Sequence, residues 1–202
     1  MNVNFEEKTF EYYLNYELEL RGGVVFPFGQ VQEGSIGADA AAHIKTRELA
    51  VLIGLLPLAI KKGEDIGRLV KYANPLVDSR FPTLRANVLF QYKRPYYITT
   101  GRGKEYSEWS KPYYRYRIDK PTGQLDKLFR VDHHFSGVTA IYAAPAIHEA
   151  TALVEAHNVK NIIENTNFVL ASKLREHSCV TYATAGRISK AHSNVDKIEQ
   201  LN

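Results

Sequence analysis

Residues 36–44 read IGADAAAHI, and residues 87–92 read NVLFQY with Lys93 directly after them. Both stretches are short and mostly apolar, which is typical of strands buried inside a sheet. Asp39 is the lone acid of the first stretch, and Gln91 lies near the end of the second. A carboxylate on a core strand is costly unless it is paired, hydrogen-bonded or bound to a metal, so Asp39 calls for a partner.

The sequence on either side of these strands alternates between helical and extended patterns. Residues 4–20 predict a helix that ends at Gly22 and Gly23, residues 24–28 an extended run, and residues 29–35 a loop or a short helical turn. Residues 46–72 predict two helices separated by residues 61–65, with the apolar run 49–60 as a buried helix, and residues 74–82 a loop. The apolar stripe expected on the first helix consists of Phe5, Tyr12, Tyr13, Tyr16 and Leu20.

The second half of the chain contributes further core elements. Residues 138–143 predict a strand, residues 147–157 a helix, residues 161–168 a loop or a short helix, and residues 178–182 a last strand. We therefore expect an α/β fold with a mixed central β-sheet flanked by helices. Residues 1–186 are expected to form one domain, followed by a polar tail at 187–202 that frays.

Composition restricts the class of protein. The chain has 202 residues, 45% of them hydrophobic, and a formal charge of +4, which favours an anionic partner. Cys179 is the single cysteine, which excludes an internal disulfide framework and fits a reducing compartment. No apolar run is long enough to cross a membrane, and no secretory signal is evident at the N-terminus. We expect a cytoplasmic protein with no membrane partner.

The polar residues of the two strands form a chemically meaningful set. Alternate residues of a strand share a face, so Gln91 and Lys93 point to the same side, while Tyr92 points away and leaves its carbonyl between them. An acid strand beside this QxK strand places oxygen ligands next to an ammonium group. Glu33, six residues before Asp39, supplies a second acid. Hard oxygen ligands of this kind are what Mg²⁺ prefers.

These residues resemble the PD-(D/E)xK nuclease superfamily, in its QxK variant. The similarity covers about residues 5–95, and more loosely residues 138–182. It implies a restriction-endonuclease-like core and Mg²⁺-dependent hydrolysis of phosphodiester bonds in DNA, with Mn²⁺ as an alternative ion and a role in restriction or anti-phage defence. Asp39, Glu33, Gln91 and the carbonyl of Tyr92 would hold the metal, and Lys93 would assist the attacking water. A homodimer or a larger defence complex would be the expected assembly.

Two features keep other interpretations open. Gln91 is neutral where an acid is usual, which favours a non-catalytic nucleic-acid-binding or scaffold subunit that retains the nuclease fold. Asp78 competes with Asp39 for the central acid, because it lies 13 residues before Gln91 instead of 52. We prefer Asp39, since its neighbours form an apolar strand and those of Asp78 form a proline-marked loop.

A basic, tyrosine-rich insertion follows Lys93, at about residues 93–120. Interleaved cations and aromatic rings suit a phosphate backbone and the faces of bases. The same composition also suits a contact between protein subunits. The residues expected to bind nucleic acid are Arg94, Tyr96, Arg102, Lys104, Lys111, Tyr113, Arg115 and Arg117.

Overall fold

The computed structural model describes residues 3–55, 60–76, 83–101, 103–118, 123–193 and 198–201. Asp78 and Arg102 lie outside the described residues, so neither prediction can be placed. The expected α/β architecture is confirmed: a five-stranded mixed sheet lies at the centre of the molecule, with helices on both faces. Within the described residues, no helix has both the length and the apolar character needed to cross a membrane.

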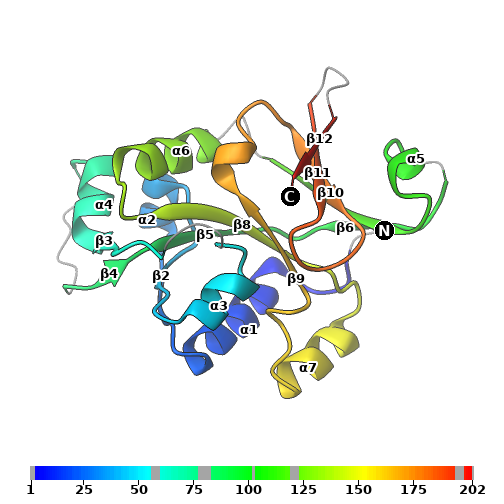
Figure 1. The fold of residues 1–202 in the computed structure, drawn as a ribbon, viewed down its shortest axis with the longest axis horizontal. Helices are drawn as coiled ribbons and strands as arrows, with labels where there is room; N and C mark the ends of the chain where they lie inside the picture. Colours follow the sequence, from blue (N-terminus) through cyan, green and yellow to red (C-terminus); the bar gives the residue numbers. More distant parts are fainter. Residues whose placement is uncertain are drawn as a thin grey trace.

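The central sheet has the order β1-β2-β5-β8-β9 (Figure 1). Its strands are β1 (Val24–Pro27), β2 (Ala40–His43), β5 (Val88–Tyr92), β8 (Thr139–Pro145) and β9 (Thr166–Leu170). The first three form an antiparallel meander, β8 runs parallel to β5, and β9 runs antiparallel to β8. The two strands predicted from residues 36–44 and 87–92 are therefore direct neighbours. Residues 161–168 were expected to form a loop or a short helix, but β9 begins at Thr166 and includes the last three of them.

Alternation along the strands creates two apolar layers, one on each face of the sheet. Val88, Phe90 and Tyr92 of β5 face α1 (Glu7–Leu20), α3 (Arg47–Leu52) and α7 (Ala150–Asn158). Leu89 of β5 and Ala41 of β2 face α2 (Gln30–Ile36), α4 (Ile66–Ala73) and α6 (Gln124–His134). Because Gln91 follows the same alternation as Leu89, it points toward the layer of α2, α4 and α6.

The tyrosine-rich insertion builds part of a second sheet. It contains β6 (Tyr96–Ile98), α5 (Tyr106–Trp109) and β7 (Tyr113–Arg117), and the sheet order is β12-β11-β10-β7-β6 (Figure 1). The other strands are β10 (Cys179–Tyr182), β11 (Ser189–His192) and β12 (Ile198–Leu201). The tail expected to fray thus supplies two strands, which pair with β10 and with each other.

The first helix buries a different face from the one predicted. Phe10, Leu14 and Leu18 are fully buried, whereas Tyr12 is 64% exposed and Tyr16 is 38% exposed. Both sets repeat every four residues, so the spacing alone does not choose between them. The larger aromatic side chains remain on the solvent side.

Short elements complete the fold. A two-stranded ladder pairs β3 (Glu64–Asp65) with β4 (Arg85–Ala86), and a single 3₁₀ turn, η1 (Ala171–Lys173), follows β9. Asn87 connects these segments: its buried side chain accepts from the Ile44 amide and donates to the carbonyls of Ile44 and Lys61. The Asn87 side chain therefore supplies hydrogen-bond partners for the backbone of Ile44, directly after β2, and for the carbonyl of Lys61.

Candidate active site at the end of the central sheet

Asp39 lies directly before β2 and is fixed by backbone hydrogen bonds on both sides. Its amide donates to the Phe90 carbonyl at 2.8 Å, and its carbonyl accepts from the Phe28 amide at 2.8 Å. Gly37, with a φ of 83°, ends α2 in the left-handed conformation and turns the chain into the strand. The turn at Gly37 is what delivers the Asp39 carboxyl to the last residues of β5.

The Asp39 carboxyl is buried against Gln91 and Tyr92, as the two-strand prediction required. Its Oδ2 atom accepts from Gln91 Nε2 and from the Tyr92 amide, both at 2.6 Å. Asp39 is 7% exposed and Gln91 is 1% exposed. The residues are 52 positions apart in the sequence, so only the pairing of β2 with β5 brings them together.

Burial dominates the electrostatics of this carboxyl. Loss of solvent raises the pKa of Asp39 from 3.8 to about 7, and the Tyr92 N–H opposes this rise. Glu7 raises the pKa further by repulsion, Lys93 lowers it by attraction, and Glu11 adds a smaller repulsion. A carboxyl with a pKa near neutrality inside a protein is a mark of functional sites.

Gln91 carries a buried oxygen without a partner. Its Nε2 atom donates to Asp39 and also to the Tyr92 carbonyl at 3.1 Å. Its Oε1 atom is buried, and no donor among the described residues reaches it. An unsatisfied amide oxygen costs free energy, so a cation or a water beside Gln91 would stabilise the structure.

Lys93 leaves β5 toward the start of α6. Its ammonium donates to Gln124 Oε1 at 2.9 Å and lies 5.8 Å from the centre of the Tyr142 ring. Its amide donates to the Ala143 carbonyl of β8 at 2.9 Å. Lys93 therefore sits on the same face as Gln91, between β8 and α6.

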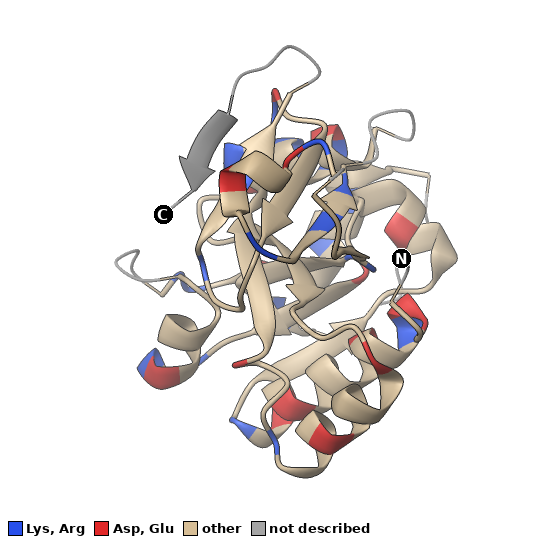
Figure 2. Cartoon of the chain, turned by 90° about the vertical axis from the view of Figure 1, so that its right-hand side faces the viewer, with Lys and Arg blue, Asp and Glu red and all other residues tan. Residues whose placement is uncertain are grey.

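Helix α1 brings two further acids that the sequence reasoning did not assign to the site. Glu7 accepts from the Arg94 amide at 2.7 Å, and Glu11 is 7% exposed. Burial raises the pKa of Glu11, whereas Lys8, 2.8 Å from it, opposes the rise. Figure 2 shows acidic positions gathered on the helices at the lower right of the view. The sequence did contain a signal for these two acids: Glu7 and Glu11 are four residues apart, which places both on one face of the predicted helix.

Glu33 joins this group less directly than predicted. It lies on α2, and its Oε1 atom is 3.2 Å from the ammonium of Lys8, which also pairs with Glu11. Glu33 contributes to the pKa of Glu11, whereas the acids acting on Asp39 are Glu7 and Glu11. The structure thus connects Glu33 to the site through Lys8, not by a contact with Asp39.

The predicted nucleic-acid residues have mixed environments. Tyr113 is fully buried and donates to Glu105 at 3.0 Å, so its ring has no free face for stacking. Arg115 pairs with the same Glu105, and Arg94 pairs with Glu6 and donates to the Val3 carbonyl. Four others are open to solvent: Tyr96, Lys104, Lys111 and Arg117.

The donor set for a divalent cation is limited. Among the described residues, no three His, Cys, Asp or Glu side chains lie close enough to hold a metal ion. The Asp39 carboxyl and the Tyr92 carbonyl both accept from the Gln91 amide nitrogen, so turning that amide would bring its oxygen beside them; Mg²⁺ is commonly held by one or two carboxylates with several waters. The orphaned Gln91 oxygen is the observation that fits such an ion.

Comparison with models of known protein families, with curated proteins and with solved structures finds no match for this chain.

Proposed function

We propose that this protein is a metal-dependent nuclease of the PD-(D/E)xK type, hydrolysing phosphodiester bonds in DNA. The observation that carries the proposal is the meeting of Asp39 with the QxK end of β5, where Asp39 Oδ2 accepts from Gln91 and from the Tyr92 amide. The meander β1-β2-β5 followed by parallel β8 agrees with a restriction-endonuclease-like core. Cleavage in a restriction or anti-phage system is the setting that the resemblance suggests.

Each residue has a defined task in this proposal. Asp39, the Gln91 amide oxygen once the amide is turned, and the Tyr92 carbonyl would hold Mg²⁺ or Mn²⁺, and Glu7 exerts the larger repulsion on Asp39 of the two acids on α1. When bound, such an ion supplies Lewis-acid activation of the phosphodiester and of a water. Asp39 must release its proton before it can serve as a ligand, because its pKa is about 7. Because protonation of Asp39 competes with the ion, ion binding should weaken as the pH falls below neutrality.

Lys93 supplies the positive charge that the reaction needs. Its ammonium is held between Gln124 and the Tyr142 ring, so it is oriented before any substrate arrives. A preorganised cation of this kind stabilises charge that develops on the phosphoryl oxygens and is worth on the order of 100- to 1,000-fold in rate. We assign this role to Lys93.

A cleavage assay tests the proposal. Plasmid and linear DNA are incubated with the protein in Mg²⁺, Mn²⁺ or EDTA, and nicking is followed by electrophoresis. We expect ion-dependent cleavage that Asp39→Asn abolishes and Lys93→Ala lowers on the order of 100-fold or more. Glu48→Gln, which removes an exposed acid of α3, is the matched control and should cut like wild type. An Asp39→Asn variant that cuts at the wild-type rate would refute the assignment.

A second function has two observations in its favour. Gln91 contributes no charge, and the described residues offer no cluster of three metal-ligating side chains of the usual acidic, His or Cys types. A non-catalytic subunit that binds nucleic acid with the same fold would have these properties. Binding of DNA by the purified protein, with no cutting in any of the ions tested, would support it over the nuclease.

A further inference from the structure

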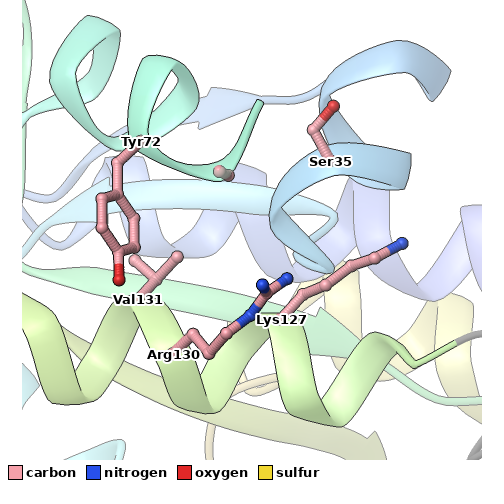
Figure 3. Close-up of a pocket in the computed structure, with 6 residues that line it drawn as sticks. Ser35, Tyr72, Lys127, Arg130 and Val131 are labelled. Atoms are coloured by element: carbon pink, nitrogen blue, oxygen red, sulfur yellow. The ribbon is translucent and has the colours of Figure 1, made fainter. Parts of the chain in front are cut away.

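A basic cavity lies between α2, α4 and α6, on the same side of the central sheet as Gln91 (Figure 3). Its volume is about 250 Å³. Among the described residues no acidic side chain lines it, and its polar groups come from Ser35, Tyr72, Lys127 and Arg130. The cavity is smaller than those that enclose drug-sized ligands, roughly 300–1,000 Å³. A phosphate group with part of its sugar fits this size better than a whole nucleotide.

The two cations of the cavity differ in how they are held. Lys127 donates to the Gly34 carbonyl at 2.7 Å, so its ammonium is fixed beside α2 and keeps two more protons to donate. Arg130 is exposed, its guanidinium points into the space between α2 and α4 (Figure 3), and within the described residues it pairs with no carboxylate. A guanidinium matches the paired oxygens of a phosphate in geometry as well as in charge.

Neutral groups complete the lining. The Tyr72 ring stacks on His134, with 4.0 Å between ring centres, which fixes the wall formed by α4. Tyr72 and Arg130 thus face the cavity from two helices, and Ser35 comes from a third. Three separate elements converge on a space that no carboxylate of the described part of the chain lines.

The position of the cavity along α6 relates it to the candidate active site. Gln124, the first residue of α6, accepts from Lys93, and Arg130 lies six positions further along the helix. Six residues of helix rise about 9 Å. Since DNA advances about 3.4 Å per nucleotide, this rise would correspond to two or three nucleotides of a strand that runs beside α6 from Lys93. The spacing along α6 suits one continuous strand that passes both places.

We propose that this cavity binds a backbone phosphate of the nucleic-acid substrate, two or three nucleotides from the scissile phosphate, through Arg130 and Lys127. This inference rests on the proposed nuclease function. Under this proposal, part of the DNA contact lies on α6 and not on the tyrosine-rich insertion. Tyr72 of α4 and Ser35 of α2 complete the pocket, which recognises the charge of the backbone and not the base sequence.

Equilibrium binding tests the inference in the absence of cleavage. A fluorescent DNA duplex is titrated with protein in EDTA, and the anisotropy is measured over a series of salt concentrations. Arg130→Gln should weaken binding equally for different sequences and reduce the slope of log affinity against log salt by about 1. Arg130→Lys should keep the slope, since it keeps the charge. Arg47→Gln, an exposed arginine at the start of α3, is the matched control.

The outcomes separate this inference from the function on which it rests. If wild type cuts DNA, Asp39→Asn does not, and Arg130→Gln binds like wild type, the phosphate site is wrong and the nuclease stands. Equal losses in Arg130→Gln and Arg47→Gln would indicate a general effect of charge and overturn the site. If the wild-type protein neither cuts nor retains DNA, both proposals fail.

Discussion

Replacing Asp39 with asparagine should stabilise the folded protein, and the gain should increase with pH. The wild-type carboxyl is buried, and its pKa is about 7 in the folded state against an ordinary 3.8. Between these two values the unfolded chain is ionised at Asp39 while the folded chain keeps the proton. Folding then takes up a proton, so the contribution of Asp39 to stability is most favourable below about pH 4 and is lost as the pH rises to about 7.

The magnitude follows from the separation of the two pKa values. A difference of about 3 corresponds to about 4 kcal/mol, at 1.36 kcal/mol per unit. An asparagine does not titrate, and its carbonyl oxygen can still accept from the Tyr92 amide. The advantage of the variant over wild type should therefore grow by about 3 kcal/mol between pH 5 and pH 8 and stay constant above pH 8. For a chain of this length, about 4 kcal/mol shifts the Tm by roughly 8–16 °C.

Urea denaturation of both proteins at several pH values, without divalent ions, measures the effect. Glu48→Gln removes one exposed negative charge and should change stability by less than about 1 kcal/mol at every pH. A difference between Asp39→Asn and wild type that does not vary from pH 5 to pH 8 would refute the reasoning. So would a variant that is less stable than wild type at pH 8.

Two further substitutions test the supports of the site. Gly37→Ala should cost about 2 kcal/mol or more in urea denaturation, because φ is 83° and a Cβ there would meet the Gln124 carbonyl at 2.5 Å, whereas Gly34→Ala in open space should be neutral or stabilising. A Gly37→Ala variant as stable as wild type would show that α2 and α6 can separate freely. Asn87→Ala should lower the free energy of unfolding by about 2–4 kcal/mol, since it leaves buried backbone groups of Ile44 without partners. A loss below 1 kcal/mol in the same measurement would contradict that role.

The sequence predicted the central strands well because their signal is local. Residues 36–44 and 87–92 are short apolar runs, and their pairing follows once both are placed in one sheet. The alternation of β5 also predicted that Gln91 and Tyr92 point to opposite faces, which the two apolar layers confirm. Asp39 meets Gln91 through these same regularities.

Helix α6 was missed, although its pattern was present in the sequence. Leu125, Leu128 and Val131 are buried and recur every three residues, which is a helical spacing. Short amphipathic helices with several charges carry a weak apolar signal, and no element was assigned to this segment for that reason.

The C-terminal strands were missed for a different reason. Segments such as SKAH at Ser189–His192 are polar, and their strand character comes from pairing with β10 and from the burial of Ala191. Pairing between strands that the sequence separates is decided by tertiary contacts and not by local propensity. The side of α1 that is buried was decided in the same way, by the fit of Phe10 against Tyr92.

The arrangement around Asp39 costs stability, and that cost is an argument for function. A buried carboxyl is held near two other acids, and the oxygen of Gln91 is buried without a donor among the described residues. Each feature would be removed by an apolar substitution if packing alone were at stake. A cation beside Asp39 would attract the ionised carboxyl, and with the Gln91 amide turned it would also bind the amide oxygen. Clusters of destabilising polar groups at the end of a well-packed sheet are expected where a protein binds a ligand, and Asp39 lies at the centre of one.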